Sequence, residues 1–145
     1  MPHLPDPELL PEFYAAVPAK RLVAWVVDGV LILLLTGVVM VATLFVTAFI
    51  LPIVYVALNV AYRWVALSRW SATPGMALMA IELRTREGNR LDRETALWHT
   101  LIYTGCFITF LPQIASVAMM LASPRGQGLG DTLLGTAMLN RPSGP

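Results

Sequence analysis

Hydrophobic positions form one unusually long apolar segment near the start of the chain. It runs from residue 22 to residue 67 and contains only two charged residues, Asp28 and Arg63. An α-helix needs about 20 residues to cross the hydrocarbon core of a bilayer. The segment is more than twice that length, so we predict two membrane-spanning helices, at about residues 20–43 and 48–68, joined by a short uncharged turn.

A further apolar segment occupies residues 97–122 and has Pro112 near its middle. Its length suits either one kinked span or two short half-spans, and the charges at its ends do not choose between them. A broken hairpin at Pro112 would require protein or water to cover the interrupted backbone. We therefore predict a helix at about residues 95–122 and leave open whether it spans once or is re-entrant, and with it the side of the carboxyl end.

Between these segments, residues 69–94 are polar and include an alternating pattern. Apolar and charged residues alternate with period 2, which is typical of a half-exposed β-strand. The sequence Glu87-Gly88-Asn89-Arg90 would turn that strand, and Leu91 would begin a short return strand. We predict a small β-hairpin here. The alternating residues are Ile81, Glu82, Leu83, Arg84, Thr85 and Arg86.

The predicted fold class is an all-α integral membrane protein with three to four transmembrane or re-entrant helices and this short β-hairpin. Residues 1–18 contain five prolines and are expected to form an extended tail without a core of its own. Residues 19–140 form the membrane domain, and residues 141–145 form a second tail. The positive-inside rule places the amino terminus and the predicted β-hairpin in the cytoplasm. Lysine and arginine lie near the start of the first predicted helix and the end of the second, and they are absent from the turn that joins these two helices.

Composition narrows the possible functions. Only 13% of the 145 residues are charged and the net charge is +1, so the chain has no electrostatic footprint for nucleic acid. It has one cysteine and two isolated histidines, and it lacks the motifs of metalloproteases, α/β-hydrolases and P-loop enzymes. We expect no enzyme activity, no metal and no cofactor.

Polar residues gather on one face of each predicted membrane helix. Polar faces in a helical bundle usually point toward one another and leave the apolar faces to lipid. On a helical projection the stripes are Arg21, Asp28, Thr36 and Thr43 on the first helix, Tyr55, Asn59, Tyr62 and Arg63 on the second, and His99, Tyr103, Cys106 and Gln113 on the third.

Asp28 and Arg63 lie at matching depths in an antiparallel helix pair, each roughly 10 Å or less from the same end. We therefore expect them to form an ion pair. A buried pair of this kind more often fixes helix register than performs chemistry, although Asp28 could instead bind a proton or a cation. His99, near a helix start, is expected to be an interfacial anchor.

Several short motifs occur in a recognisable order between about residues 14 and 139. They resemble the RDD family of small bacterial membrane proteins, named for one arginine and two aspartates, which here are Arg21, Asp28 and Asp131. Two positions depart from the family pattern: Met76 replaces a lysine, and His99 replaces an arginine. The other matching motifs are Thr73-Pro74-Gly75, Glu82-Leu-Arg-Thr-Arg-Glu-Gly88 and Gln127-Gly-Leu-Gly-Asp131-Thr-Leu-Leu-Gly-Thr136.

The resemblance implies a multi-pass protein of the bacterial inner membrane, in which Asp131 lies close to Arg21. It adds Asp131 to a polar network with Arg21, Asp28, Asn59 and Arg63, whose two acids and two bases would be electrically neutral. Sodium/proton exchange is proposed for some members of the family, whose function is otherwise largely unassigned.

Two functions therefore stand side by side. The first is ion- or proton-coupled transport through the intramembrane arginine–aspartate network, in which His99, Tyr103 and Gln113 would be secondary participants. The second is a non-catalytic accessory or scaffold role, binding a partner or lipid. The expected partners are the lipid bilayer and either a second copy of the chain or another membrane protein, without nucleic acid.

Overall fold

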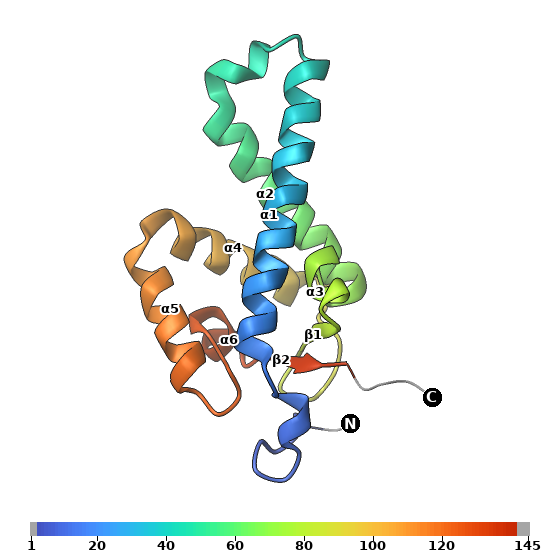
Figure 1. Ribbon diagram of the computed structural model, residues 1–145, viewed down its shortest axis with the longest axis vertical. Coiled ribbons are helices and arrows are strands. Elements are labelled where there is room, and N and C mark those ends of the chain that lie inside the picture. The colour runs from blue at the N-terminus through green and yellow to red at the C-terminus, as the bar shows by residue number, and fades with distance from the viewer. Residues whose placement is uncertain (1–2, 142–145) are drawn as a thin grey trace.

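The computed structural model, which describes residues 3–141, is a long helical hairpin standing on a base of shorter elements (Figure 1). Helix α1 (Val17–Ala42) and helix α2 (Leu51–Trp70) form the hairpin, and the 3-10 helix η2 (Val46–Ile50) connects them. The base comprises α3 (Pro74–Leu78), β1 (Ile81–Arg84), α4 (Arg93–Thr109), α5 (Leu111–Ala122), α6 (Leu129–Leu134) and β2 (Ala137–Asn140).

Both hairpin helices are long and apolar enough to cross a membrane. Their bounds agree within three residues with the predicted helices at about 20–43 and 48–68. Leu33, Leu34 and Val38 on α1 each expose more than 60% of their surface, which is the expected property of side chains that face lipid. The two hairpin helices are thus the candidate membrane spans of the fold.

The third apolar segment is broken into α4 and α5, whose axes bend by 116°. The break lies at Phe110, which has a positive φ of 62°, and Pro112 falls in the first turn of α5. Proline is tolerated there because the first helical N–H groups have no intrahelical acceptor. A bend of more than 90° sends α5 back toward the end from which α4 starts. The segment is therefore not one continuous helix, and the bent pair is either a broken span or a re-entrant loop.

The two strands pair with each other, but they come from distant parts of the sequence. β1 runs antiparallel to β2, with Ile81 opposite Asn140 and Arg84 opposite Ala137. The predicted local β-hairpin is therefore wrong. The chain does turn after Arg84, but the backbone N–H of Leu91 donates to Ser71 Oγ (2.6 Å) instead of to β1. Period-2 alternation identified the strand without identifying its partner.

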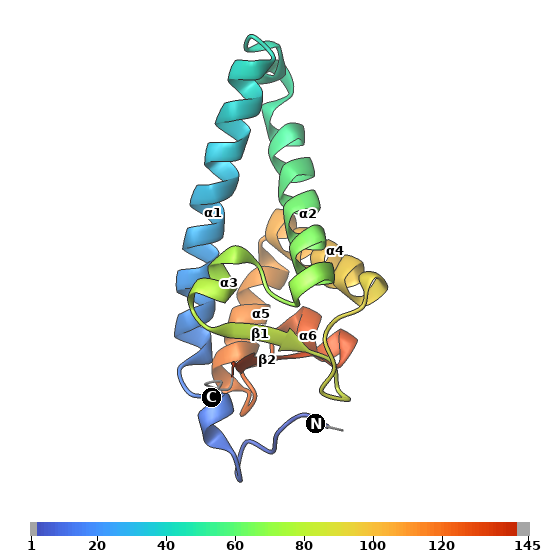
Figure 2. The same cartoon turned by 90° about the vertical axis from the view of Figure 1, so that its right-hand side faces the viewer.

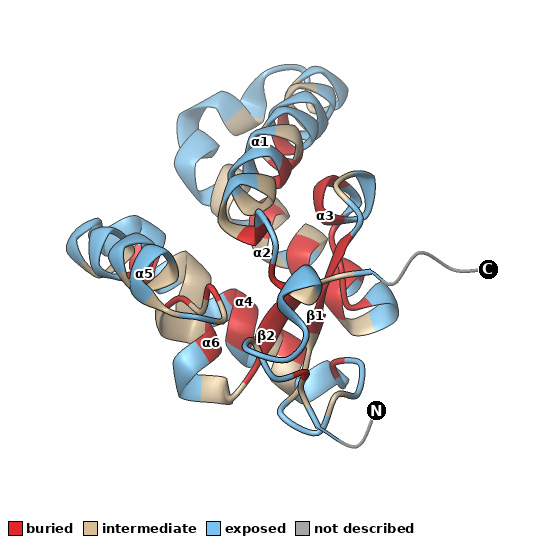
Figure 3. Ribbon diagram, turned by 60° about the horizontal axis from the view of Figure 1, so that its bottom comes forward, coloured by how far each residue is buried: buried red, intermediate tan, exposed pale blue. Residues whose placement is uncertain are grey.

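This pairing draws both ends of the α4–α5 segment to one end of the molecule, and Figure 2 shows the strands lying across the foot of the hairpin. Buried residues concentrate in that region, while the distal end of the hairpin is mostly exposed (Figure 3). The main core cluster consists of Val17, Ala24, Leu67, Ala72, Met76, Ile81, Leu83, Leu91, Ala96 and Met138.

The amino-terminal segment is packed instead of forming an extended tail. It contains the 3-10 helix η1 (Pro11–Phe13), and the Tyr14 hydroxyl donates to the carbonyl of Pro5 (2.8 Å). Tyr14 is buried in a small cluster with Ala137 and Leu139 of β2, which supplies the apolar surface that the segment lacks. Apart from Arg141, the predicted tail at 141–145 lies outside the described residues.

Candidate functional site

Asp28 is buried on the inner face of α1 and receives three hydrogen bonds. The Tyr62 hydroxyl donates to Oδ1 (2.8 Å), the Thr73 hydroxyl to Oδ2 (2.5 Å) and the Gly75 backbone N–H to Oδ1 (2.8 Å). All three donors are neutral. We call these four residues the Asp28 cradle. It links α1 to α2 and to the start of α3.

The sequence Thr73-Pro74-Gly75 builds one side of this cradle. Thr73 is the N-cap of α3, and its oxygen also accepts from the Met76 N–H (3.3 Å). Gly75 lies so close to α1 that an added Cβ would be 2.3 Å from the Ala24 carbonyl oxygen and 2.8 Å from Asp28 Oδ1. Only glycine fits this approach, so the motif is a carboxylate receptor as well as a turn.

Asp131, in α6, is also buried and receives four hydrogen bonds. Arg21 Nη1 lies 2.6 Å from Oδ2 and His99 Nε2 lies 2.9 Å from Oδ1. The Gly128 N–H (3.1 Å) and the Thr136 hydroxyl (3.2 Å) complete the set. We call these five residues the Asp131 cluster. It joins α1, α4 and α6.

The protonation of Asp131 is governed by opposing effects. Burial raises the pKa of its carboxyl, but the charge of Arg21 and the hydrogen bond from His99 outweigh burial and hold the pKa well below its usual range. Asp131 is therefore an anion at neutral pH. An ionised carboxylate can only accept a hydrogen bond, so the Nε2 atom of His99 carries the hydrogen in its contact with Asp131.

A third group of polar residues connects α1, α2 and α4. The guanidinium carbon of Arg63, on α2, lies 3.7 Å from the centroid of the Tyr103 ring on α4. Trp25 on α1 donates to the Tyr103 hydroxyl (2.8 Å). Arg63 Nε and Asn59 Oδ1 are buried and have no hydrogen-bond partner among residues 3–141. We call Trp25, Asn59, Arg63 and Tyr103 the arginine layer.

The expected ion pair between Asp28 and Arg63 is absent. None of the ion pairs found among residues 3–141 includes either residue. The reason is helical phase: Tyr62 and Arg63 are consecutive and point about 100° apart. Tyr62 faces α1 and reaches Asp28, whereas Arg63 faces α4 and stacks on Tyr103.

The other predicted residues, apart from Gln113, divide between these groups. Arg21 and Asp131 meet, as the family resemblance implies, while His99 is a buried partner of Asp131 and not the interfacial anchor that was expected. Gln113 lies in α5 beyond the break, and its side chain makes no hydrogen bond within the described part of the chain. The break at Phe110 resets the helical phase on which its placement depended.

Three residues acquired a role that the sequence did not predict. The sequence pattern indicates only a turn at Thr73 and Gly75, although both residues belong to a matching motif. Thr136 is the last residue of the matching motif at residues 127–136, and its hydroxyl donates a hydrogen bond to Asp131. The motifs themselves were the available signal, since each supplies donors to one of the two aspartates.

One comparison with known proteins gives a match. The model of the RDD family matches residues 15–135, a range that includes Arg21, Asp28 and Asp131. No curated protein and no solved structure matches the chain.

Proposed function

Because this chain belongs to the RDD family, whose membrane proteins have no known biochemical role, we propose that it is a non-catalytic membrane accessory protein. In this proposal the hairpin anchors the protein, and the base presents a surface that binds lipid or a protein partner. Arg21, Asp28 and Asp131, the residues for which the family is named, would then serve to hold the base on the hairpin.

The proposed topology has α1 and α2 spanning a bacterial inner membrane, with the base and the amino terminus in the cytoplasm. Its support is the charge distribution: the connection at residues 43–50 contains no lysine or arginine, whereas Lys20, Arg21 and Arg69 lie at the other end of the hairpin. The α4–α5 pair would enter the membrane from the cytoplasmic side and return, because β1 and β2 flank it and pair with each other.

The main support for the accessory role is that both buried aspartates are hydrogen-bonded by donors of this chain. Asp28 accepts three hydrogen bonds and Asp131 accepts four, all from this chain. A carboxylate that carries a proton or a cation across a membrane must exchange protein ligands for water or for the ion. Donors fixed in position by a helix cap and a close helix contact favour a structural role.

Transport remains the second candidate, and the arginine layer is the observation that favours it. Arg63 is buried at the level of the membrane helices, and no ion pair to it occurs among the described residues. Charged residues at such depth often mark ion or substrate pathways. With at most three candidate spans within residues 3–141, a pathway would require a second copy of the chain.

Reconstitution into liposomes separates the two functions. Sodium uptake and internal pH are measured for the wild type, Asp28→Asn and Arg63→Gln, with protein-free liposomes and Arg69→Gln as controls. Arg69 is exposed at the end of α2, so its substitution matches the charge change of Arg63→Gln. The accessory role predicts the same background flux in all samples.

Flux in the wild type and in Arg69→Gln, lost in a folded Asp28→Asn or Arg63→Gln variant, would overturn the accessory role in favour of transport. Folding is verified by a monodisperse elution profile in detergent before reconstitution.

A further inference from the structure

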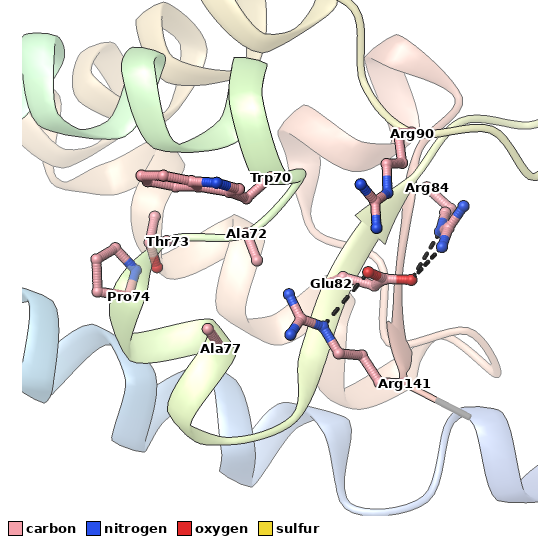
Figure 4. A pocket seen from close by; sticks show the side chains of 9 residues that line it. All are labelled: Trp70, Ala72, Thr73, Pro74, Ala77, Glu82, Arg84, Arg90 and Arg141. Carbon is pink, nitrogen blue, oxygen red and sulfur yellow. Dashed lines mark hydrogen bonds and ion pairs between the residues drawn. The ribbon is translucent and has the colours of Figure 1, made fainter. Parts of the chain in front are cut away.

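A pocket of about 610 Å³ opens at the edge of the base, where the end of α2 meets α3 and β1 (Figure 4). Three arginines and one glutamate line it, so its lining carries two more positive than negative charges. None of the three residue groups around the aspartates and Arg63 accounts for this pocket. The lining residues that matter here are Trp70, Thr73, Glu82, Arg84, Arg90 and Arg141.

Glu82 orients two of the arginines. Its Oε1 accepts from Nε (2.8 Å) and Nη2 of Arg84, and its Oε2 lies 3.4 Å from Nε of Arg141. Glu82 is buried, so these pairs hold both guanidinium groups against the wall of the pocket. Its charge is already shared between them and cannot neutralise a third cation.

Arg90 is that third cation. It forms no ion pair within residues 3–141, and Figure 4 shows its guanidinium group turned toward the same space as those of Arg84 and Arg141. Like charges that converge repel one another unless an anion lies between them. Glu82 supplies only one negative charge among these three arginines, so the pocket is suited to a further anion.

Guanidinium groups suit a phosphate especially well, because their paired N–H donors match two phosphate oxygens. The pocket volume of about 610 Å³ exceeds what a bare inorganic ion requires and is within the range of small organic ligands. A phosphate ester with a small organic substituent fits these two constraints together.

The surroundings of the pocket favour a lipid as the source of a bound phosphate. Trp70, the last residue of α2, lines the pocket and is 53% exposed, and tryptophan favours the level of lipid headgroups. Leu78 at the end of α3 is 72% exposed on the neighbouring element. The basic lining therefore adjoins apolar surface that acyl chains would cover.

We propose that this pocket binds the phosphate of an anionic phospholipid headgroup, with the acyl chains lying along the apolar surface of α2. The proposal deepens the accessory role and rests on it for the side of the membrane. Thr73 belongs both to this pocket and to the Asp28 cradle, so a bound headgroup would contact the same segment that Asp28 holds on α1.

The test is a lipid titration of the purified full chain in detergent, followed by native mass spectrometry. Phosphatidylglycerol is the anionic probe, phosphatidylcholine with the same acyl chains is the neutral probe, and glycerol phosphate represents a headgroup without chains. The key variant is Arg90→Gln, which removes the arginine that holds no carboxylate. Arg86→Gln is the matched control, because Arg86 is exposed and does not line the pocket.

We expect the wild type and Arg86→Gln to prefer phosphatidylglycerol over phosphatidylcholine by about tenfold or more, and Arg90→Gln to lose most of that preference. Equal binding of both lipids, or equal losses in Arg90→Gln and Arg86→Gln, would overturn the site. Glycerol phosphate that binds as tightly as the lipid would also overturn it, because the site would then belong to a free phosphate ester.

This outcome is independent of the flux measurement. Selective lipid binding together with ion flux would retain the lipid site and reject the accessory role. Unselective binding without flux would reject the lipid site and leave a protein partner as the ligand of the base.

Discussion

The Asp28 cradle and the Asp131 cluster bury the same side chain in two different ways. Each carboxylate is about 1% exposed. Asp28 is satisfied by neutral donors, one of them a backbone N–H that only a glycine can bring close enough. Asp131 is satisfied mainly by the charge of Arg21 and by His99. The first site depends on close packing, and the second depends on charge.

The difference matters because the two sites hold different elements on α1. Asp28 attaches α2 and α3 to α1, whereas Asp131 attaches α4 and α6. Substitutions that disturb charge and substitutions that disturb packing should therefore loosen different regions. The following experiments test that division, beginning with the largest expected effect.

Isosteric amide substitutions should separate the two sites most clearly. Asp131→Asn removes the charge opposite Arg21, which is only 14% exposed, and should lower the free energy of unfolding by about 3 kcal/mol. Asp28→Asn should cost only about 1 kcal/mol, because no cation depends on it and the Thr73 hydroxyl can rotate to accept a hydrogen bond. Unfolding titrations with sodium dodecyl sulfate in mixed micelles measure both values.

Equal losses in the two variants would contradict the division between charge and packing. Arg69→Gln, which alters an exposed arginine at the end of α2, serves as the control and should change the free energy of unfolding by less than about 0.5 kcal/mol.

Crowding the Asp28 cradle should have the next largest effect. The new Cβ of Gly75→Ala would lie 2.3 Å from the Ala24 carbonyl oxygen, so the variant should lose about 1–3 kcal/mol of stability. Gly37→Ala is the matched control, because nothing beyond the adjoining backbone of its own helix lies within 4 Å of an added Cβ there. The same unfolding titration should find Gly37→Ala neutral or slightly stabilised, and similar losses for both variants would argue against a close contact at Gly75.

Removing one donor from the cradle should have a smaller effect. Thr73→Val keeps the shape of the side chain but leaves Asp28 Oδ2 without its donor and the Met76 N–H without its acceptor, at a cost of about 1 kcal/mol or more. Thr73→Ser retains the hydroxyl and should lose less. Hydrogen–deuterium exchange of α3 provides the readout, since faster exchange is expected in the valine variant alone. Faster exchange in α6 alone would contradict the prediction, because α6 belongs to the Asp131 cluster and not to the Asp28 cradle.

Acidification should have the smallest effect over the ordinary range of pH. The pKa of Asp131 lies below the value of about 3.9 in an unfolded chain, so the unfolded state binds the proton first. The stability that Asp131 contributes is therefore retained from pH 7 to about pH 4 and lost at lower pH as the folded carboxyl is protonated. Asp131→Asn should lack this acid-dependent component. An identical acid profile in the variant would show that the Arg21–Asp131 charge pair does not contribute to stability.

Some features of the fold followed from local patterns. The apolar segments predicted α1 and α2 within three residues of their observed bounds. The polar stripes placed Asp28, Asn59, Arg63 and His99 on faces that are buried. Helical periodicity and the length of an apolar segment are properties of neighbouring residues, and so the sequence alone displays them.

The tertiary structure alone decided which strands pair and which side chains contact each other. The alternation at residues 81–86 identified a strand, but its partner β2 lies more than 50 residues further along the chain. The matching depths of Asp28 and Arg63 predict an ion pair between them. Tyr62 and Arg63 point about 100° apart on α2, however, and it is Tyr62 that faces Asp28 and donates a hydrogen bond to it. A pattern along one element shows which side chains share a face. Which of them meet depends on how the helices are rotated and packed, and that is a property of the whole fold.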